Sequence, residues 1–284
     1  MNNLRSALTV VLLTPFPALA CSLDFALKPT PISVNYEPFS SLGALGKTTF
    51  ELKNTGAEDE FILELRKLEG SQLDDFSLSF EAKTSDAQLR TIDENRFRLS
   101  IDSGQAKQIN LNTLVSHASV PAAGVTTATY ELEATSATTG LSCWEEEYLS
   151  VQINAPSRAQ LNIAGTDSAF VDGPDIYHLD FGRLVEGLSR RIFLQLRANE
   201  DVLMTLESEN KGTMRHKELV KYAVAYQFAL SGQVLDLSSK TSLSLPAAPT
   251  FRGVSLPVDI TIGEVDGVPS GDYADTITID VSAL

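Results

Sequence analysis

The most informative stretch of the chain is residues 271–284, which read Gly-Asp-Tyr-Ala-Asp-Thr-Ile-Thr-Ile-Asp-Val-Ser-Ala-Leu. Its apolar side chains Tyr273, Ile277, Ile279 and Val281 alternate with polar ones, which is the period-two pattern of a half-buried β-strand. We therefore expect a strand that runs to residue 284 and presents these four side chains on one face.

A similar stretch occurs earlier, where residues 124–133 read Gly-Val-Thr-Thr-Ala-Thr-Tyr-Glu-Leu-Glu. Aligning Gly124 with Gly271 places residues 129–133 over residues 276–280. The earlier copy continues through a turn into one more predicted strand, at 147–153, whereas the later copy ends. If the two halves share a fold, the second half lacks its last strand, and we expect another chain to supply it.

The same alternation recurs along the chain, most clearly in Tyr222–Leu230, where every second residue is large and apolar. Turn signals such as Asp266-Gly267 separate these runs. Many short strands with frequent turns predict an all-β chain of two immunoglobulin-like antiparallel β-sandwiches. We place the division near Asn154–Arg158, with an N-terminal sandwich over residues 21–155 and an incomplete C-terminal sandwich over residues 156–284.

The first twenty residues have the pattern of a secretory signal peptide. Arg5 supplies the positive charge, residues 8–19 form a short apolar run, and Ala18-Leu19-Ala20 fits an A-x-A cleavage site. We therefore expect residues 1–20 to be removed on export, which leaves Cys21 as the first mature residue. A lipoprotein is the alternative, and Ala18 in place of the usual lipobox leucine argues against it.

Cys21 and Cys143 are the only two cysteines of the chain. Because an exported chain meets an oxidising compartment, we predict a disulfide between them, with two buried thiols as the alternative. The cysteines and the scattered His117, His178 and His216 do not have the spacing of a metal site, so no metal or cofactor is predicted.

Net charge and motifs exclude several classes of function. A net charge of −15 and an isoelectric point near 4.6 argue against binding to nucleic acid or to anionic membranes. The carboxylates of Glu145–Glu147 are consecutive, so on a strand they point to opposite faces and do not converge on one bond. We interpret Trp144 as core packing against the disulfide, with a ligand contact as the alternative, and His216 as part of a surface loop. The sequence gives no basis for an enzyme, since no phosphate-binding loop, dinucleotide fingerprint or nucleophile elbow occurs.

Several segments of the second half resemble, in order, the spore coat protein U-type pilin domain of archaic chaperone–usher pili. These segments are Leu179–Arg190, Arg197–Asn199, Ser208–Gly212 and Gly271–Ile277. The first half matches more weakly, through Cys21, Val34–Phe39 and Lys53–Gly56. The resemblance implies an incomplete immunoglobulin-like domain in a Gram-negative cell-surface fibre.

The family resemblance also implies the partners. A periplasmic pilus chaperone lends the missing strand, an outer-membrane usher assembles the fibre, and the adjacent pilin subunit replaces the lent strand with its own N-terminal extension. We expect Tyr273, Ile277, Ile279 and Val281 to line one wall of the groove that receives these strands.

A Cys21–Cys143 tether would leave no free N-terminal arm to donate, which implies a subunit at the pilus tip, on the cell surface. The first half would then be an adhesin that attaches to host or abiotic surfaces and supports biofilm formation. Candidate adhesion loops contain Leu42, Ala44 and Leu45, then Val120 and Pro121, and then Leu141. The alternatives are a minor adaptor pilin within the fibre and a secreted carbohydrate-binding module.

Overall fold

A computed structural model describes residues 21–40, 42–70, 76–85, 88–117, 119–144, 146–173 and 176–284. The predicted signal peptide, residues 1–20, lies outside the described residues. Within them the chain forms strands, turns and loops, which confirms the all-β prediction. No segment of these residues is a helix long and apolar enough to cross a membrane.

The first ten strands form one sandwich of two sheets. One sheet has the order β1-β3-β8-β5 and the other the order β2-β10-β9-β4-β7-β6. The strands are β1 (Leu23–Leu27), β2 (Ile32–Asn35), β3 (Ala44–Asn54), β4 (Asp59–Lys67), β5 (Phe76–Lys83), β6 (Leu89–Asp93), β7 (Arg96–Ile101), β8 (Ala106–His117), β9 (Gly124–Ser136) and β10 (Tyr148–Ala155). All pairings in these sheets are antiparallel except that of β10 with β2.

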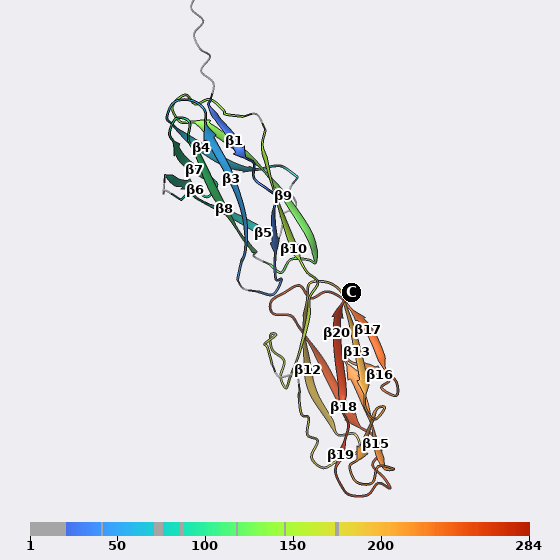
Figure 1. Ribbon diagram of the computed structural model, residues 1–284. Helices are drawn as coiled ribbons and strands as arrows, with labels where there is room; N and C mark the ends of the chain where they lie inside the picture. The colour runs from blue at the N-terminus through green and yellow to red at the C-terminus, as the bar shows by residue number, and fades with distance from the viewer. Residues whose placement is uncertain are drawn as a thin grey trace, which may run out of the picture.

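The last ten strands form a second sandwich, which continues from the end of the first (Figure 1). Its larger sheet has the order β11-β12-β18-β15-β14-β19, with β16 beside β15, and its smaller sheet has the order β17-β13-β20. The strands are β11 (Ala159–Ala164), β12 (Ser189–Ala198), β13 (Val202–Ser208), β14 (Thr213–His216), β15 (Ala223–Leu230), β16 (Gln233–Leu235), β17 (Thr241–Leu245), β18 (Val254–Ile262), β19 (Tyr273–Ala274) and β20 (Ile277–Ala283).

Both sandwiches follow the immunoglobulin plan, in which strands A, B, E and D form one sheet and C, F and G the other. The first sandwich fills every place: β1, β3, β8 and β5 are A, B, E and D, and β4, β9 and β10 are C, F and G. In the second sandwich, β11, β12, β18 and β15 are A, B, E and D, while β13 and β20 are C and F. Among the described residues, no strand occupies the place of G beside β20.

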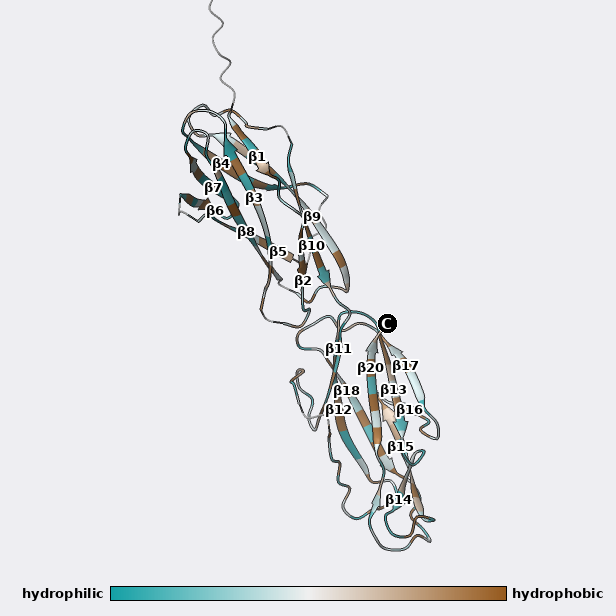
Figure 2. Ribbon diagram, in the orientation of Figure 1, coloured by the Kyte–Doolittle hydropathy of each residue, from teal (hydrophilic) through white to brown (hydrophobic). Residues whose placement is uncertain are grey.

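Alternating side chains build a separate core in each sandwich, and this alternation is visible along the strands of Figure 2. Along β9 the inward residues are buried and the outward ones are partly exposed, as expected for a strand between core and solvent. The largest fully buried side chains of the first core include Phe50, Phe61 and Phe97, and those of the second include Phe228.

A disulfide and the single tryptophan secure the end of the first sandwich that lies away from the second. Cys21 and Cys143 are joined, which closes a loop with a sequence separation of 122 residues. Trp144 packs on Phe25 at a ring distance of 4.6 Å and donates its indole N–H to the carbonyl of Leu132 at 2.7 Å. Trp144 therefore belongs to the first core, as interpreted from the sequence.

The junction between the sandwiches is hydrogen-bonded on both sides of Asn199. The Arg158 amide donates to Asn199 Oδ1 at 2.7 Å, and Asn199 Nδ2 donates to the carbonyl of Pro156 at 3.1 Å. The Arg197 guanidinium lies 4.0 Å from the centre of the Phe170 ring and 4.9 Å from that of Phe39, a residue of the first sandwich. These contacts fix the short linker at the start of the second sandwich.

Candidate functional site: a groove beside the last strand

β20 is an edge strand whose inward side chains are incompletely covered. It pairs antiparallel with β13 over its whole length, from Ser208 opposite Ile277 to Val202 opposite Ala283. Its inward residues are only half-buried, although they pack on the second core, and its outward residues are exposed. The backbone of its other edge has no strand partner among the described residues. Unpaired edges of this kind are places where a further strand can add.

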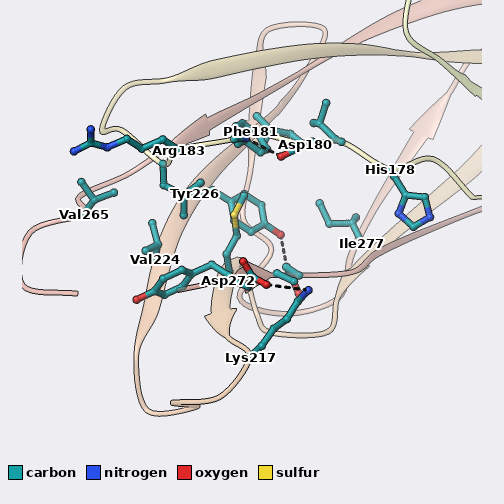
Figure 3. Close-up of a pocket in the computed structure, with 18 of the residues that line it drawn as sticks. His178, Asp180, Phe181, Arg183, Lys217, Val224, Tyr226, Val265, Asp272 and Ile277 are labelled. Carbon is teal, nitrogen blue, oxygen red and sulfur yellow. Dashed lines mark hydrogen bonds and ion pairs between the residues drawn. The ribbon is translucent and has the colours of Figure 1, made fainter. Parts of the chain in front are cut away.

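A groove of about 860 Å³ runs along this edge. Ile277 and Ile279 form one wall, and residues 177–184, which precede β12, form the opposite wall. The floor is the inner face of the larger sheet, with Ile192, Met214, Val224, Tyr226, Phe228 and Ile260. Figure 3 shows Phe181 of the far wall, Tyr226 of the floor and Ile277 of the near wall around the same space. The groove therefore opens directly onto apolar core residues.

A partly buried hydrogen-bond network fixes the start of β20 at one end of the groove. Asp275 Oδ2 accepts hydrogen bonds from the hydroxyl of Tyr226 at 2.5 Å and from that of Ser208 at 2.6 Å. Asp275 Oδ1 accepts the backbone N–H of Asn210 at 2.9 Å. Burial, together with the hydrogen bond to Asp275, raises the pKa of Tyr226. The tyrosine hydroxyl therefore remains a protonated donor across the physiological pH range.

His216 lies at the same end, and its position corrects the sequence interpretation. We expected a surface loop, but His216 is on β14 and is buried, with its ring edge-on to Tyr273 at 5.0 Å. Its Nδ1 accepts the backbone N–H groups of Glu218 and Leu219 at 3.1 and 3.0 Å. The surface interpretation failed because it relied on the flanking lysines and arginine, whereas in a short strand the inward residues alternate with outward ones.

The four residues predicted to line a groove wall do not belong to one strand. Tyr273 lies on β19, which pairs with β14, and its hydroxyl donates to the carbonyl of Pro269 at 2.8 Å. Ile277, Ile279 and Val281 follow on β20, after the break at Asp275. Tyr273, Ile277 and Ile279 line the groove, whereas Val281 packs nearer the junction.

The structure separates the three loops predicted for adhesion. Leu42, Ala44 and Leu45 lie at the start of β3, and Val120 and Pro121 lie just before β9. Both segments are at the end of the first sandwich that faces the second, where Ala123 donates its N–H to the carbonyl of Asn199 at 3.3 Å. Leu141 lies at the opposite end, beside the disulfide loop.

Exposure also differs among these loop residues. Leu42, Leu45 and Leu141 are exposed, Leu42 most strongly, whereas Val120 and Pro121 are buried. The exposed Leu114, which sequence reasoning did not single out, lies opposite Leu45 on the outer face of the sheet. Periodicity alone does not reveal such a pair, because the pair depends on the register between two distant strands.

Comparison with known proteins gives matches among solved structures only. The sequence matches no protein-family model and no curated protein. A chain of the CsuC–CsuE chaperone–tip adhesion subunit pre-assembly complex, from the archaic chaperone–usher Csu pili of Acinetobacter baumannii, is 12% identical, with a TM-score of 0.43. That match covers 91% of this chain and 99% of the other.

Two further matches have similar extents. The CupB6 tip adhesin from Pseudomonas aeruginosa is 10% identical, with a TM-score of 0.40, and the match covers 92% of this chain and 95% of that one. A chain of the chaperone–tip adhesin complex of CFA/I fimbriae is 11% identical, with a TM-score of 0.38, and the match covers 93% and 91%. These matches do not assign the chain to a family.

Proposed function

We propose that this chain is a spore coat protein U-type subunit of a chaperone–usher pilus, and that its second sandwich accepts a β-strand from a partner protein. The observation that supports this proposal is the G place beside β20, which no strand of the described residues fills and where half-buried isoleucines face a groove that reaches the core. A strand added at this edge forms main-chain hydrogen bonds with β20 and buries alternate side chains in the groove.

The proposed assembly sequence involves three partners. A periplasmic chaperone covers the groove after export, because an open edge with apolar core residues favours aggregation. An outer-membrane usher then brings the next pilin, whose N-terminal extension replaces the strand of the chaperone. The division into an adhesin at residues 21–155 and a pilin domain at residues 156–284 is part of this proposal.

A position at the pilus tip agrees with the disulfide at the start of the first sandwich. Cys21 is held in the disulfide, and β1 begins two residues later in the first sandwich, so the described residues leave no free arm to donate. The first sandwich contains its own G strand, β10, and needs no donor. In this proposal the first sandwich is the exposed adhesive module, and it attaches the fibre to host or abiotic surfaces during biofilm formation.

Production of the chain in a bacterial periplasm, with and without a pilus chaperone, tests the proposal. The mature chain is produced alone and together with the chaperone encoded beside it. We expect degradation or aggregation of the chain alone, and a stable one-to-one complex when the chaperone is present. A chain that is soluble, monomeric and cooperatively folded in both sandwiches without the chaperone would contradict the proposal and favour the secreted binding module.

A further inference from the structure

The groove beside β20 is not uniform along its length. At the junction end, Val281 packs with Leu161 of β11 in one apolar cluster, so the two sheets are closed there. β11 ends at Ala164, and farther from the junction Ile277 and Ile279 line the cavity. The groove is therefore shallow beside Val281 and deep beside Ile277.

The first sandwich provides an internal reference for the strand that would fill this space. The middle of β9 pairs with β4 through Leu132 and Leu65, and the middle of β20 pairs with β13 through Ile279 and Leu206. These pairs superpose the two F strands residue by residue, in agreement with the alignment of the two sequence copies.

In this superposition Tyr130 of β9 corresponds to Ile277 of β20. β10 runs antiparallel to β9 and places Leu149, which is buried, opposite Tyr130. The pairing of β10 with β9 ends at Glu131, so no described residue of β10 lies opposite Ala134, which is the counterpart of Val281. The strand that the chain supplies to itself thus places a large apolar side chain at the level where the second sandwich has its cavity.

The outer face of β20 adds a charge requirement. Asp280 is exposed and takes part in no ion pair among the described residues, whereas its counterpart Glu133 is paired with Arg66 of β4. Arg66 also donates to Glu131, at 2.7 Å. In β13 the place of Arg66 is taken by Glu207, so the second sandwich has a carboxylate where the first has the pairing cation. A strand added beside β20 with a Lys or Arg opposite Asp280 neutralises this carboxylate.

We propose that the partner strand runs antiparallel to β20, with a large apolar side chain opposite Ile277, a small one opposite Val281, and an outward Lys or Arg opposite Asp280. This inference rests on the proposed function and specifies the chemistry of the segment that the groove selects. The cavity sets the apolar preference, and the unpaired carboxylate sets the charge preference.

Fusions of the full mature chain test the size preference. A turn of about four residues and a nine-residue strand are added after Leu284, so that the strand folds back antiparallel beside β20. One fusion carries Leu opposite Ile277 and Ala opposite Val281, and the other has the same composition with these two residues exchanged. We expect the second sandwich of the first fusion to melt at least about 5 °C higher than that of the exchanged fusion. In the first fusion the leucine fills the cavity beside Ile277, whereas in the exchanged fusion the leucine overpacks the closed end beside Val281.

The charge preference is tested on the more stable fusion, with Lys or Glu at the outward position opposite Asp280. Lys should raise the melting temperature by a few degrees relative to Glu at low salt, and 0.5 M NaCl should reduce the difference. Asp280→Asn, which keeps the size of the side chain, should remove most of the difference. Equal melting temperatures for Lys and Glu, or a difference that survives Asp280→Asn, would overturn the charge preference.

The results separate this inference from the proposed function. If both exchanged fusions stabilise the second sandwich equally, or if the order is reversed, a strand is accepted but the size preference is wrong. If the chain without an added strand is already stable, and neither fusion raises its melting temperature, the groove does not accept a strand and the proposed function fails as well.

Discussion

β9 and β20 occupy the same place in the two sandwiches, and they differ in what lies on their outer edge. β9 pairs with β4 on one side and with β10 on the other, and its inward Tyr130 and Leu132 are buried. Within the part of the chain that the structure describes, β20 pairs with β13 alone, and its inward Ile277 and Ile279 are half-buried beside a groove. Similar alternating sequences thus form an interior strand with buried inward residues when a further strand such as β10 pairs with the outer edge, and an edge strand with half-buried inward residues when no described strand does so.

The test with the largest expected effect disrupts the packing of β10 against the core of the first sandwich. Val151 lies on β10 opposite Ala128 and is fully buried, so Val151→Asp places an unpaired carboxylate in the core. We expect a loss of about 3–5 kcal/mol in the stability of the first sandwich. Because Trp144 is the only tryptophan and belongs to this sandwich, its fluorescence during thermal unfolding reports the change.

The matched control for this variant is Gln152→Asp, which places the same carboxylate on the exposed face of β10. Its melting temperature should stay close to that of the unmodified chain. A Val151→Asp variant that melts like the control would show that β10 does not complete the first core, and the contrast between β9 and β20 would disappear.

A second test concerns the disulfide, which the second sandwich lacks. Replacing Cys21 and Cys143 by Ser should destabilise the first sandwich by about 2–5 kcal/mol, because the open chain gains entropy when it unfolds. Trp144 fluorescence should report the loss. The unfolding of the second sandwich, followed by circular dichroism in a strand-complemented fusion, should not change. A fluorescence transition at an unchanged temperature would contradict the prediction that the disulfide tethers the N-terminal arm to the first sandwich.

The sequence predicts part of the difference between the two sandwiches. Alternation predicted the strand over Ile277–Val281, and the extra strand after β9 was expected at 147–153 and is β10, Tyr148–Ala155. These predictions succeed because half-buried strands need one apolar face, which is a local property of the sequence.

Other features depend on pairing between distant segments and were not accessible in this way. The far wall of the groove, residues 177–184, has no regular secondary structure and hence no period. The loops of Leu42 and Leu141 are both apolar, but only strand order shows that they lie at opposite ends of the first sandwich. The sequence likewise does not predict that Tyr273 lies on a strand separate from β20, because the break at Asp275 depends on its hydrogen bonds to Tyr226 and Asn210, which are distant in the chain.

Asp275 leads to the smallest expected effect, since it marks a local difference between the two F strands. In the superposition of β20 on β9, its counterpart is Ala128, which lies inside the continuous strand β9. Tyr226→Phe removes one hydrogen bond to the Asp275 carboxylate and leaves the packing of the ring in place. In a strand-complemented fusion this should cost the second sandwich about 1–3 kcal/mol, because a partly buried carboxylate loses a donor.

The control for Tyr226→Phe is Tyr273→Phe, which removes a hydrogen bond to a backbone carbonyl instead of one to a carboxylate. We expect it to cost less, because bonds to charged groups are the stronger ones. Proteolysis of the chain at the start of β20 should increase in Tyr226→Phe and not in the control. Equal stability and equal cleavage of the two variants would mean that the Asp275 network does not hold the start of β20, and that the main-chain pairing with β13 suffices to define the edge that a donor strand meets.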